Sequence, residues 1–234
     1  MTVCGAETIG NRRRPERTWG DNLLADHLEF FRQFRHRFET TGAVAPSSRF
    51  LARAMLGPLR DKTGPRRVLE VGPGTGAVTR FLVQQLQPDD RLDLVELNES
   101  FASLLRARFD NDPRYRAAAS QSRVHVCPLQ EFEAEAPYDC IISGLPLNNF
   151  PVELVRRIFE SYDRLLAPGG TLSYFEYMYV RPLRSLVSSR PEKMRLRALD
   201  RIMNTRLERD RFDRSWVFVN LPPAWVQHLR KADH

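Results

Sequence analysis

The sequence predicts an α/β domain whose mainly parallel sheet carries helices on both faces. Three observations predict it: short apolar, β-prone runs alternate with helical patterns, a triple-glycine turn follows the first run, and an acidic residue closes the next run. In a sheet of this kind the carboxyl ends of the strands share one edge, where ligands bind. Residues at the ends of strands are therefore the first candidates for a functional site.

The glycine turn is the feature around which the rest of the chain is organised. The apolar run at 68–71 stops there, and from residue 77 the apolar side chains recur at helical spacing. Glycines at three alternate positions allow a tight turn and let a ligand approach the backbone. The candidate cofactor-binding residues of this stretch are Glu70, Gly72, Pro73, Gly74, Thr75 and Gly76.

Two cofactors fit this turn. The spacing from Gly72 through Gly74 to Ala77 satisfies the loose dinucleotide pattern G-x-G-x-x-A, with an acid about 20 residues later. The same residues read E-x-G-x-G-x-G from Glu70, which puts a carboxylate before the glycines. A dinucleotide needs a helix N-terminus against its pyrophosphate, whereas the cationic amino group and sulfonium of S-adenosylmethionine suit a nearby acid. The methyl donor is favoured, and a dinucleotide or a purely structural turn remains an alternative.

The second strand, predicted over 91–97, ends in Glu96 and Leu97. A carboxylate at this edge of the sheet can accept hydrogen bonds from both ribose hydroxyls of an adenosine. An ordinary strand-end charge is the alternative, which the spacing from Gly72 disfavours. Both residues are therefore candidates for cofactor binding.

The other elements follow in order along the chain. Helices are predicted over 19–38, 46–55, 77–86, 99–109, 151–166 and, in a basic segment interpreted as an insertion, 182–211. Strands are predicted over 122–126, 138–143, 171–177, 216–220 and 224–229. We expect a disordered basic tail at 1–18, a helical lid and membrane-contact region at 19–60, and the main domain at 61–234.

Positive charge is concentrated in two segments of the chain. The 234 residues, enough for one domain with a full core, carry a net charge of +7. Residues 11–60 contribute +5 and residues 181–214 contribute +6, which leaves −4 for the remainder. This distribution favours an anionic partner, either nucleic acid or an anionic lipid surface. Solvated arginine faces are the alternative.

The predicted helix over 19–38 combines a phenylalanine-rich face with arginines. This composition is typical of a helix that lies in a lipid interface. A cap helix that packs its apolar face on the domain is an equal alternative, and the two interpretations are compatible. The candidate membrane residues are Phe30, Phe31, Phe34, Arg32 and Arg35.

Several classes are disfavoured by the composition. No run of 18 apolar residues exists, so no spanning helix is expected, and the N-terminal residues lack the apolar region of a secretory signal. Three widely spaced cysteines and five scattered histidines predict reduced thiols and no metal site. We therefore expect a cytoplasmic protein that is peripheral at the inner face of the membrane.

Four phrases, LEVGPGTG, LVELN, YDCIISGLP and LLAPGGTLSYFEY, resemble the class I S-adenosylmethionine-dependent methyltransferases over residues 44–230. Within that class, GAVAPSSRFLARAM, SGLPLNNFP and VNLPPAWV are similar to bacterial phospholipid N-methyltransferases. The resemblance implies a Rossmann-like, seven-stranded sheet whose last strand is antiparallel. It also implies methylation of the amine of phosphatidylethanolamine, or of its methylated forms, at the membrane surface.

The nearest rival is the family of rRNA adenine dimethyltransferases, which shares the glycine turn and has an N-L-P-Y motif. Here the aligned residues are Gly144-Leu145-Pro146-Leu147, without the asparagine and the aromatic that hold an extruded base. Nucleic acid is therefore disfavoured, and a non-catalytic membrane-binding domain of the same fold is a further alternative. Many relatives also place an acid against the adenine after the third strand, where this chain offers Leu129 or Gln130.

Methyl transfer from a sulfonium mainly requires an uncharged amine to be positioned in line with the S–CH₃ bond. The candidate catalytic residues are Ser143 and Gly144, at the end of the fourth strand, and Tyr177; Ser143 is also a candidate for cofactor binding. Strand alternation puts Tyr174 and Tyr177 on opposite faces, and Glu176 is a possible proton acceptor, with an ordinary strand-end acid as the alternative. The candidate substrate-binding residues are Ser47, Ser48, Arg49, Asn148 and Arg181.

Overall fold

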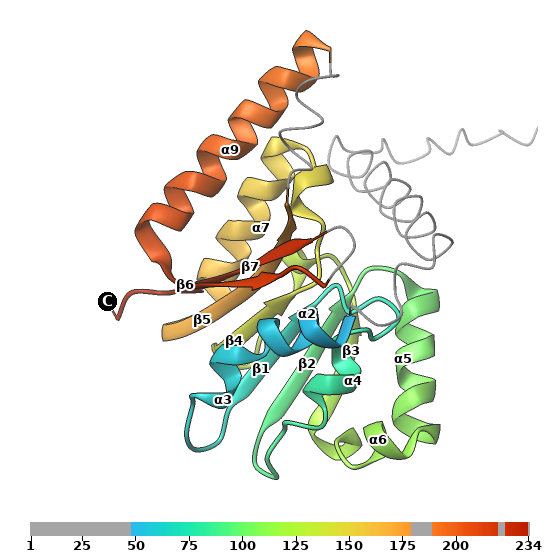
Figure 1. The fold of residues 1–234 in the computed structure, drawn as a ribbon. Coiled ribbons are helices and arrows are strands. Elements are labelled where there is room, and N and C mark those ends of the chain that lie inside the picture. Colours follow the sequence, from blue (N-terminus) through green and yellow to red (C-terminus); the bar gives the residue numbers. More distant parts are fainter. Residues whose placement is uncertain (1–47, 179–188, 220–222, 234) are drawn as a thin grey trace, which may run out of the picture.

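The computed structural model describes residues 48–178, 189–219 and 223–233. Its centre is a sheet with the strand order β3-β2-β1-β4-β5-β7-β6 (Figure 1). The strands are β1 Arg67–Val71, β2 Arg91–Glu96, β3 Ser122–Val126, β4 Tyr138–Ser143, β5 Leu166–Tyr177, β6 Arg211–Val217 and β7 Ala224–Arg230.

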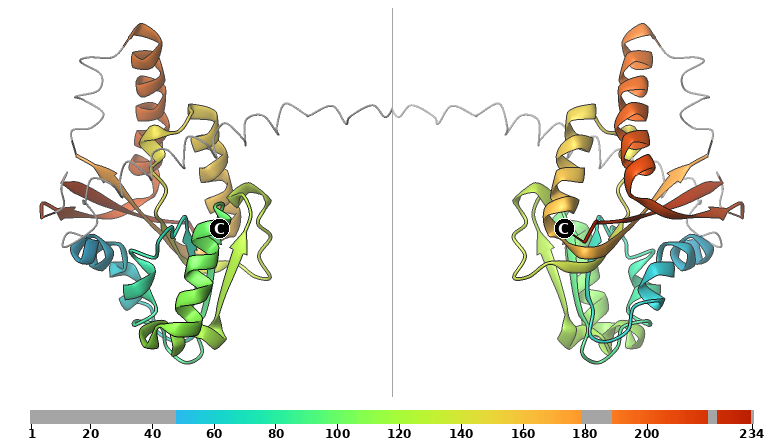
Figure 2. Two further views of the ribbon diagram at one scale, coloured as in Figure 1. Left: turned by 90° about the vertical axis from the view of Figure 1, so that its right-hand side faces the viewer. Right: turned by 90° about the vertical axis from the view of Figure 1, so that its left-hand side faces the viewer.

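Helices cover both faces of this sheet (Figure 1, Figure 2). One face packs against α7 Val152–Leu165 and α9 Arg190–Asp210. The other face packs against α2 Ser48–Met55, α3 Gly57–Arg60, α4 Thr79–Leu82, α5 Glu99–Asn111 and α6 Pro113–Arg116. Three 3₁₀ turns complete the described part: η1 Ala119–Gln121, η2 Leu129–Glu131 and η3 Leu147–Asn149.

The directions of the strands decide which strand ends lie at the same edge of the sheet. β1 to β5 pair in parallel, whereas β7 is antiparallel to both β5 and β6. β6 therefore runs parallel to β5, and its last residues lie at the edge where β1, β2, β4 and β5 end. We call this the ligand edge. The predicted Rossmann-like, seven-stranded sheet with helices around it and an antiparallel last strand is confirmed.

Several boundaries differ from the prediction for identifiable reasons. The helix after the glycine turn is a single short segment, α4, because turns follow Leu82 where an apolar pattern to residue 86 was expected. β5 begins at Leu166, five residues before the predicted start, because Gly169 and Gly170 exchange backbone hydrogen bonds with Lys231 at 3.1 and 2.9 Å. β6 begins at 211 because an edge strand exposes its polar residues and so lacks an apolar run.

Some predictions fall outside the described residues. These are the tail at 1–18, the helix over 19–38 with its five membrane candidates, Ser47 and Arg181. α9 confirms helix over most of 182–211 and forms the connection between β5 and β6, with Leu196, Leu199 and Met203 buried. No helix among the described ranges is long and apolar enough to cross a bilayer. Within those ranges no cluster of side chains could hold a metal ion.

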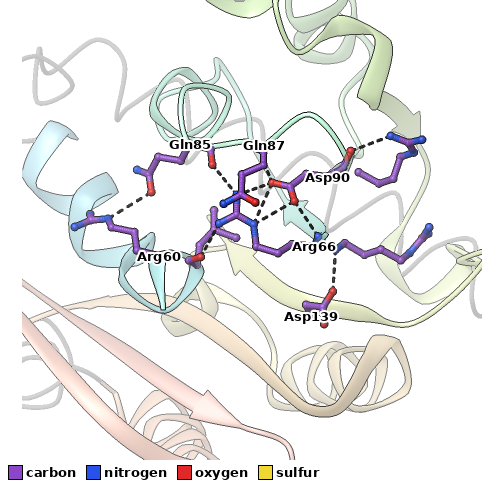
Figure 3. A network of polar contacts seen from close by, with 9 residues as sticks. Arg60, Arg66, Gln85, Gln87, Asp90 and Asp139 are labelled. Carbon is purple, nitrogen blue, oxygen red and sulfur yellow. Dashed lines mark hydrogen bonds and ion pairs between the residues drawn. The ribbon is translucent and has the colours of Figure 1, made fainter. Parts of the chain in front are cut away.

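A buried ion pair joins the starts of β1 and β2 at the edge opposite the ligand edge (Figure 3). The Arg66 guanidinium donates to Asp90 through Nη2 at 2.5 Å and Nε at 3.0 Å, and the backbone N–H groups of Arg66 and Gln87 donate to the same carboxylate, each at 2.8 Å. Arg66 also donates to the backbone carbonyls of Leu59 and Gln85. Four segments are thereby joined at this point.

Candidate active site

The ligand edge aligns residues from four neighbouring strands. Strand register places side by side, in the order β2-β1-β4-β5, Val95, Val71, Ser143 and Tyr174. Residues in one row of a sheet point to one face, here the face that α7 covers. The turns that follow β1, β2 and β4 therefore meet above this row.

The glycine turn adopts backbone angles that only glycine takes readily. Gly72, Gly74 and Gly76 have φ values of +65°, +56° and +74°. The turn is held from behind, because the Arg108 guanidinium donates to the carbonyl of Thr75 and the Tyr115 hydroxyl donates to that of Gly76 at 3.3 Å. The predicted need for glycine at these positions is thus explained by geometry.

Glu96 is fully buried beneath this turn. One carboxylate oxygen accepts the Gly74 N–H at 2.9 Å, and the other accepts the Asn98 N–H at 3.0 Å. The acid therefore orients the glycine turn and also lines a hollow at the ligand edge. Its position is the one that the sequence predicts for a ribose-binding carboxylate.

The hollow lies between the strand ends and the first turns of α7. It is narrow, with a cavity volume of about 70 Å³. Its lining residues are Val71, Gly72, Val95, Glu96, Leu97, Cys127, Pro128, Leu129, Gln130, Leu145, Phe150, Leu154 and Ile158. A narrow apolar slot with one carboxylate suits a nucleoside, whose base is flat and whose ribose donates hydrogen bonds.

The structure brings together some of the predicted cofactor residues. Gly72, Glu96, Leu97, Leu129 and Gln130 line the hollow. The rest of the glycine turn, Pro73 to Gly76, borders it through the Gly74–Glu96 bond. Burial raises the pKa of the Cys127 thiol, so this lining residue stays a neutral, weakly polar wall.

Glu70 lies apart from the hollow. It is buried on the opposite face of the sheet, in register with Leu94 and Ile142. Burial raises the pKa of Tyr115, and the charge of Glu70 adds to that effect, so the two residues share a region behind the glycine turn. A direct role for Glu70 toward the donor amino group stays a prediction.

Ser143 holds the turn that follows β4. Its buried hydroxyl accepts from Tyr162 Oη at 2.6 Å and from the Leu145 N–H at 3.3 Å, and burial raises the pKa of Tyr162. Leu145 in turn packs over Gly72, since a Cβ on Gly72 would lie 2.7 Å from Leu145 Cδ2. Ser143 thus positions the wall of the hollow, and its catalytic role stays a prediction.

Gly144 has no room for a side chain. A Cβ there would lie 2.6 Å from the carbonyl oxygen of Gly72, and the Gly144 N–H donates to the Val71 carbonyl at 2.8 Å.

We expect Gly144→Ala to push the two turns apart and to weaken donor binding about tenfold or more, since overpacking costs about 1–3 kcal/mol. Calorimetry with S-adenosylmethionine measures it. Gly57→Ala is the matched control, because no atom lies within 4 Å of the added methyl; wild-type affinity in Gly144→Ala would contradict the expectation.

Buried polar side chains of β5 and β7 lie on the same sheet face as the row that borders the hollow. Tyr174 is in register with Gln227, and Glu176 with Trp225. Glu176 and Gln227 are only 3% and 2% exposed. Gln227 Oε1 and Trp225 Nε1 find no hydrogen-bond partner among the residues that the structure describes. Tyr177, the third catalytic candidate, packs on the opposite face, as strand alternation predicts, and burial raises its pKa.

Several residues of this site were not found from the sequence. Phe150, Leu154 and Ile158 of the α7 region line the hollow, and Gln227 reaches the site only through the pairing of β7 with β5. The phrase SGLPLNNFP contains Phe150 and is the only sequence signal for these four. In the sequence, apolar residues of a helix such as α7 show the same pattern whether they line a hollow or pack in a closed core.

Comparison with known proteins agrees with this geometry. Residues 68–170 match the family described as "Methyltransferase domain". The chain is 32% identical over 155 residues to the ornithine lipid N-methyltransferase of Singulisphaera acidiphila, which covers 66% of this chain and 80% of that protein. Among solved structures, the N-methyltransferase NodS of Bradyrhizobium japonicum has a TM-score of 0.55 at 16% identity, over 80% of this chain and 98% of that one.

The fold and the edge site together define a Rossmann-like transferase domain built around a narrow slot at the ligand edge. The chain belongs to the class I S-adenosylmethionine-dependent methyltransferases. It is thus a methyltransferase that uses S-adenosylmethionine, and the dinucleotide alternative is set aside. RNA-modifying relatives also match: the tRNA1(Val) (adenine(37)-N6)-methyltransferase of Aeromonas hydrophila is 33% identical over 138 residues, 51% of this chain and 55% of that protein.

The residues present fit the donor. Positive-φ glycines leave the backbone accessible, Glu96 is one of the lining residues, and Leu97 with Leu129 offers apolar walls for the base. Gln130 is the one amide side chain among the lining residues, and its contact with the edge of the adenine stays a prediction.

Proposed function

We propose that this enzyme methylates the amine of a phospholipid, phosphatidylethanolamine or its methylated forms, at a membrane surface. The observation that carries the proposal is that Glu176 and Gln227 are buried polar side chains on the sheet face that borders the hollow, next to Tyr174 in the row of Ser143. An amine nucleophile is held by acceptors, and a carboxylate and an amide oxygen are both acceptors. The relative from S. acidiphila, named as a lipid N-methyltransferase, supports nitrogen as the atom methylated.

The chain's own task is positioning, since the donor supplies a methyl group that its sulfonium already activates. Backbone carbonyls of the turn at 143–146 and Gln227 Oε1 accept hydrogens of the amine and align its lone pair. Glu176, on the same face, takes the proton that an ammonium must lose before it can react. Ser143 and Tyr162 keep the turn in place through their 2.6 Å hydrogen bond.

Head-group phosphate and bilayer contacts complete the proposal. Arg49 is exposed at the start of α2, and Asn148 is partly exposed in η3. With Ser47, Ser48 and Arg181 they are the proposed contacts for the phosphate. The helix predicted over 19–38 is proposed to lie on an anionic leaflet, at the cytoplasmic face of the membrane.

The test is methylation by the purified full chain with a labelled donor. Separate reactions contain phosphatidylethanolamine vesicles, ornithine lipid vesicles, and tRNA with rRNA. We expect label in phosphatidylethanolamine, resolved by thin-layer chromatography. Label in RNA and none in lipid would overturn the proposal, and label in ornithine lipid alone would reject phosphatidylethanolamine as the substrate.

Gln227→Leu tests the amine contact. We expect KM for the lipid to rise about tenfold, because the loss of one hydrogen bond weakens binding by about that factor. The Kd for the donor should stay unchanged. Thermal stability should hold or rise, because an apolar group replaces a buried oxygen that has no partner in the described part of the chain. Gln84→Leu, on the exposed surface of the other face, is the control. A Gln227→Leu enzyme with wild-type kinetics would remove Gln227 from the site.

A further inference from the structure

An aromatic surface ends the β6 strand. Trp216, Phe218 and Val219 are 50%, 65% and 65% exposed. Trp216 stacks on Phe218 with ring centroids 5.5 Å apart, and it meets Trp225 edge to face at 5.8 Å. The Arg214 guanidinium lies 5.0 Å from the Trp216 ring centroid and 5.4 Å from that of Trp225. We call these five residues the aromatic tip.

The aromatic tip lies at the ligand edge. β6 runs parallel to β5, so residues 216–219 lie where β5 ends. Register aligns Trp216 with Trp225 and Trp225 with Glu176, which puts all three side chains in one row on one face. The tip is therefore continuous with the buried acid that the proposed reaction uses.

The chain that leads into the tip is basic. Residues 190–219 contain nine Arg or Lys and five Asp or Glu. Of these, Arg214 lies at the tip itself, against the Trp216 and Trp225 rings. Basic side chains beside exposed aromatics suit the head-group region of an anionic bilayer, where tryptophan places its ring at the polar boundary. Three exposed side chains are too few for a stable protein interface, which needs about 800 Å² per partner.

We propose that the aromatic tip is a bilayer contact of this enzyme, in which Trp216, Phe218 and Val219 enter the head-group region of an anionic membrane. This contact orients the molecule so that the ligand edge faces the lipid. Trp225 then lies between the bilayer and Glu176. The inference rests on the proposed function, because a bilayer contact serves an enzyme whose substrate is a lipid. The binding measurement below does not depend on catalysis.

The experiment is co-sedimentation of the full chain with vesicles of phosphatidylethanolamine and phosphatidylglycerol. For the triple variant Trp216→Ser, Phe218→Ser, Val219→Ser we expect the partition coefficient to fall at least tenfold, with donor affinity unchanged. The matched control is Phe212→Ser, on the same strand but at the opposite edge, 42% exposed and 4.3 Å from the Arg230 guanidinium. Its vesicle binding should equal that of the wild type.

Each outcome decides something different. Undiminished vesicle binding in the triple variant, or an equal loss in Phe212→Ser, overturns the tip as a bilayer contact. Loss of self-association without loss of vesicle binding assigns the tip to a second copy of the chain and also overturns it. If wild-type protein binds vesicles through the tip but methylates no lipid, the tip stands and the proposed function falls. Retained methylation of detergent-dispersed lipid by the triple variant supports both.

Discussion

Glu96→Gln should weaken S-adenosylmethionine binding about 100-fold. The Glu96 carboxylate accepts one backbone N–H on each oxygen, from Gly74 and from Asn98, and lines the slot that the ribose would occupy. Glutamine has only one acceptor oxygen, so its NH₂ group would face a backbone N–H. Loss of charge-assisted bonds worth about 1.5–3 kcal/mol each accounts for the magnitude.

Calorimetry measures this effect, and circular dichroism checks the fold. The matched control is Glu99→Gln, three residues further on, where the side chain is 64% exposed and pairs with Arg106. Donor affinity within threefold of wild type in Glu96→Gln would show that this acid holds only the glycine turn. The account of the slot as the nucleoside site would then fail.

Asp90→Asn should lower the free energy of unfolding by about 3–5 kcal/mol, because it leaves the buried Arg66 guanidinium without its carboxylate. Whole domains are stable by about 5–15 kcal/mol, so this is a large fraction. Chemical denaturation measures the change. Asp89→Asn alters the neighbouring, exposed acid and should change stability by less than about 0.5 kcal/mol.

The same pair predicts a pH dependence with a definite sign. Burial alone would raise the pKa of Asp90, but hydrogen bonds from Arg66 and from the Gln87 backbone lower it below the ordinary value of 3.8. The folded chain therefore binds this proton less readily than the unfolded chain. The contribution is full above about pH 5, and it declines as pH falls through 3.8 toward the folded pKa. A difference between wild type and Asp90→Asn that stays constant to pH 3 would contradict this reason.

Local signals in the sequence account for the strands and for part of the site. β3 and β4 match their predicted bounds: Pro137 and Gly144 flank β4, and Pro128 closely follows β3. Glu96 and the glycines were predictable because strand ends in a parallel sheet converge on one edge. Leu129 and Gln130 line the slot as the resemblance implied.

The remaining features depend on contacts between distant segments. Arg66 and Asp90 each precede a strand and look like solvated charges until the two strands pair. Gln227 joins the site because β7 reverses direction, which no short window of sequence encodes. Tyr162 reaches Ser143 from the helix that follows, and its position on α7 is otherwise that of a core residue.

The Arg66–Asp90 pair and the ligand edge occupy opposite ends of the same strands. The ion pair fastens the strand starts without touching the groups that border the slot. Substitutions around residue 90 should therefore change the working temperature of the enzyme and leave its turnover intact.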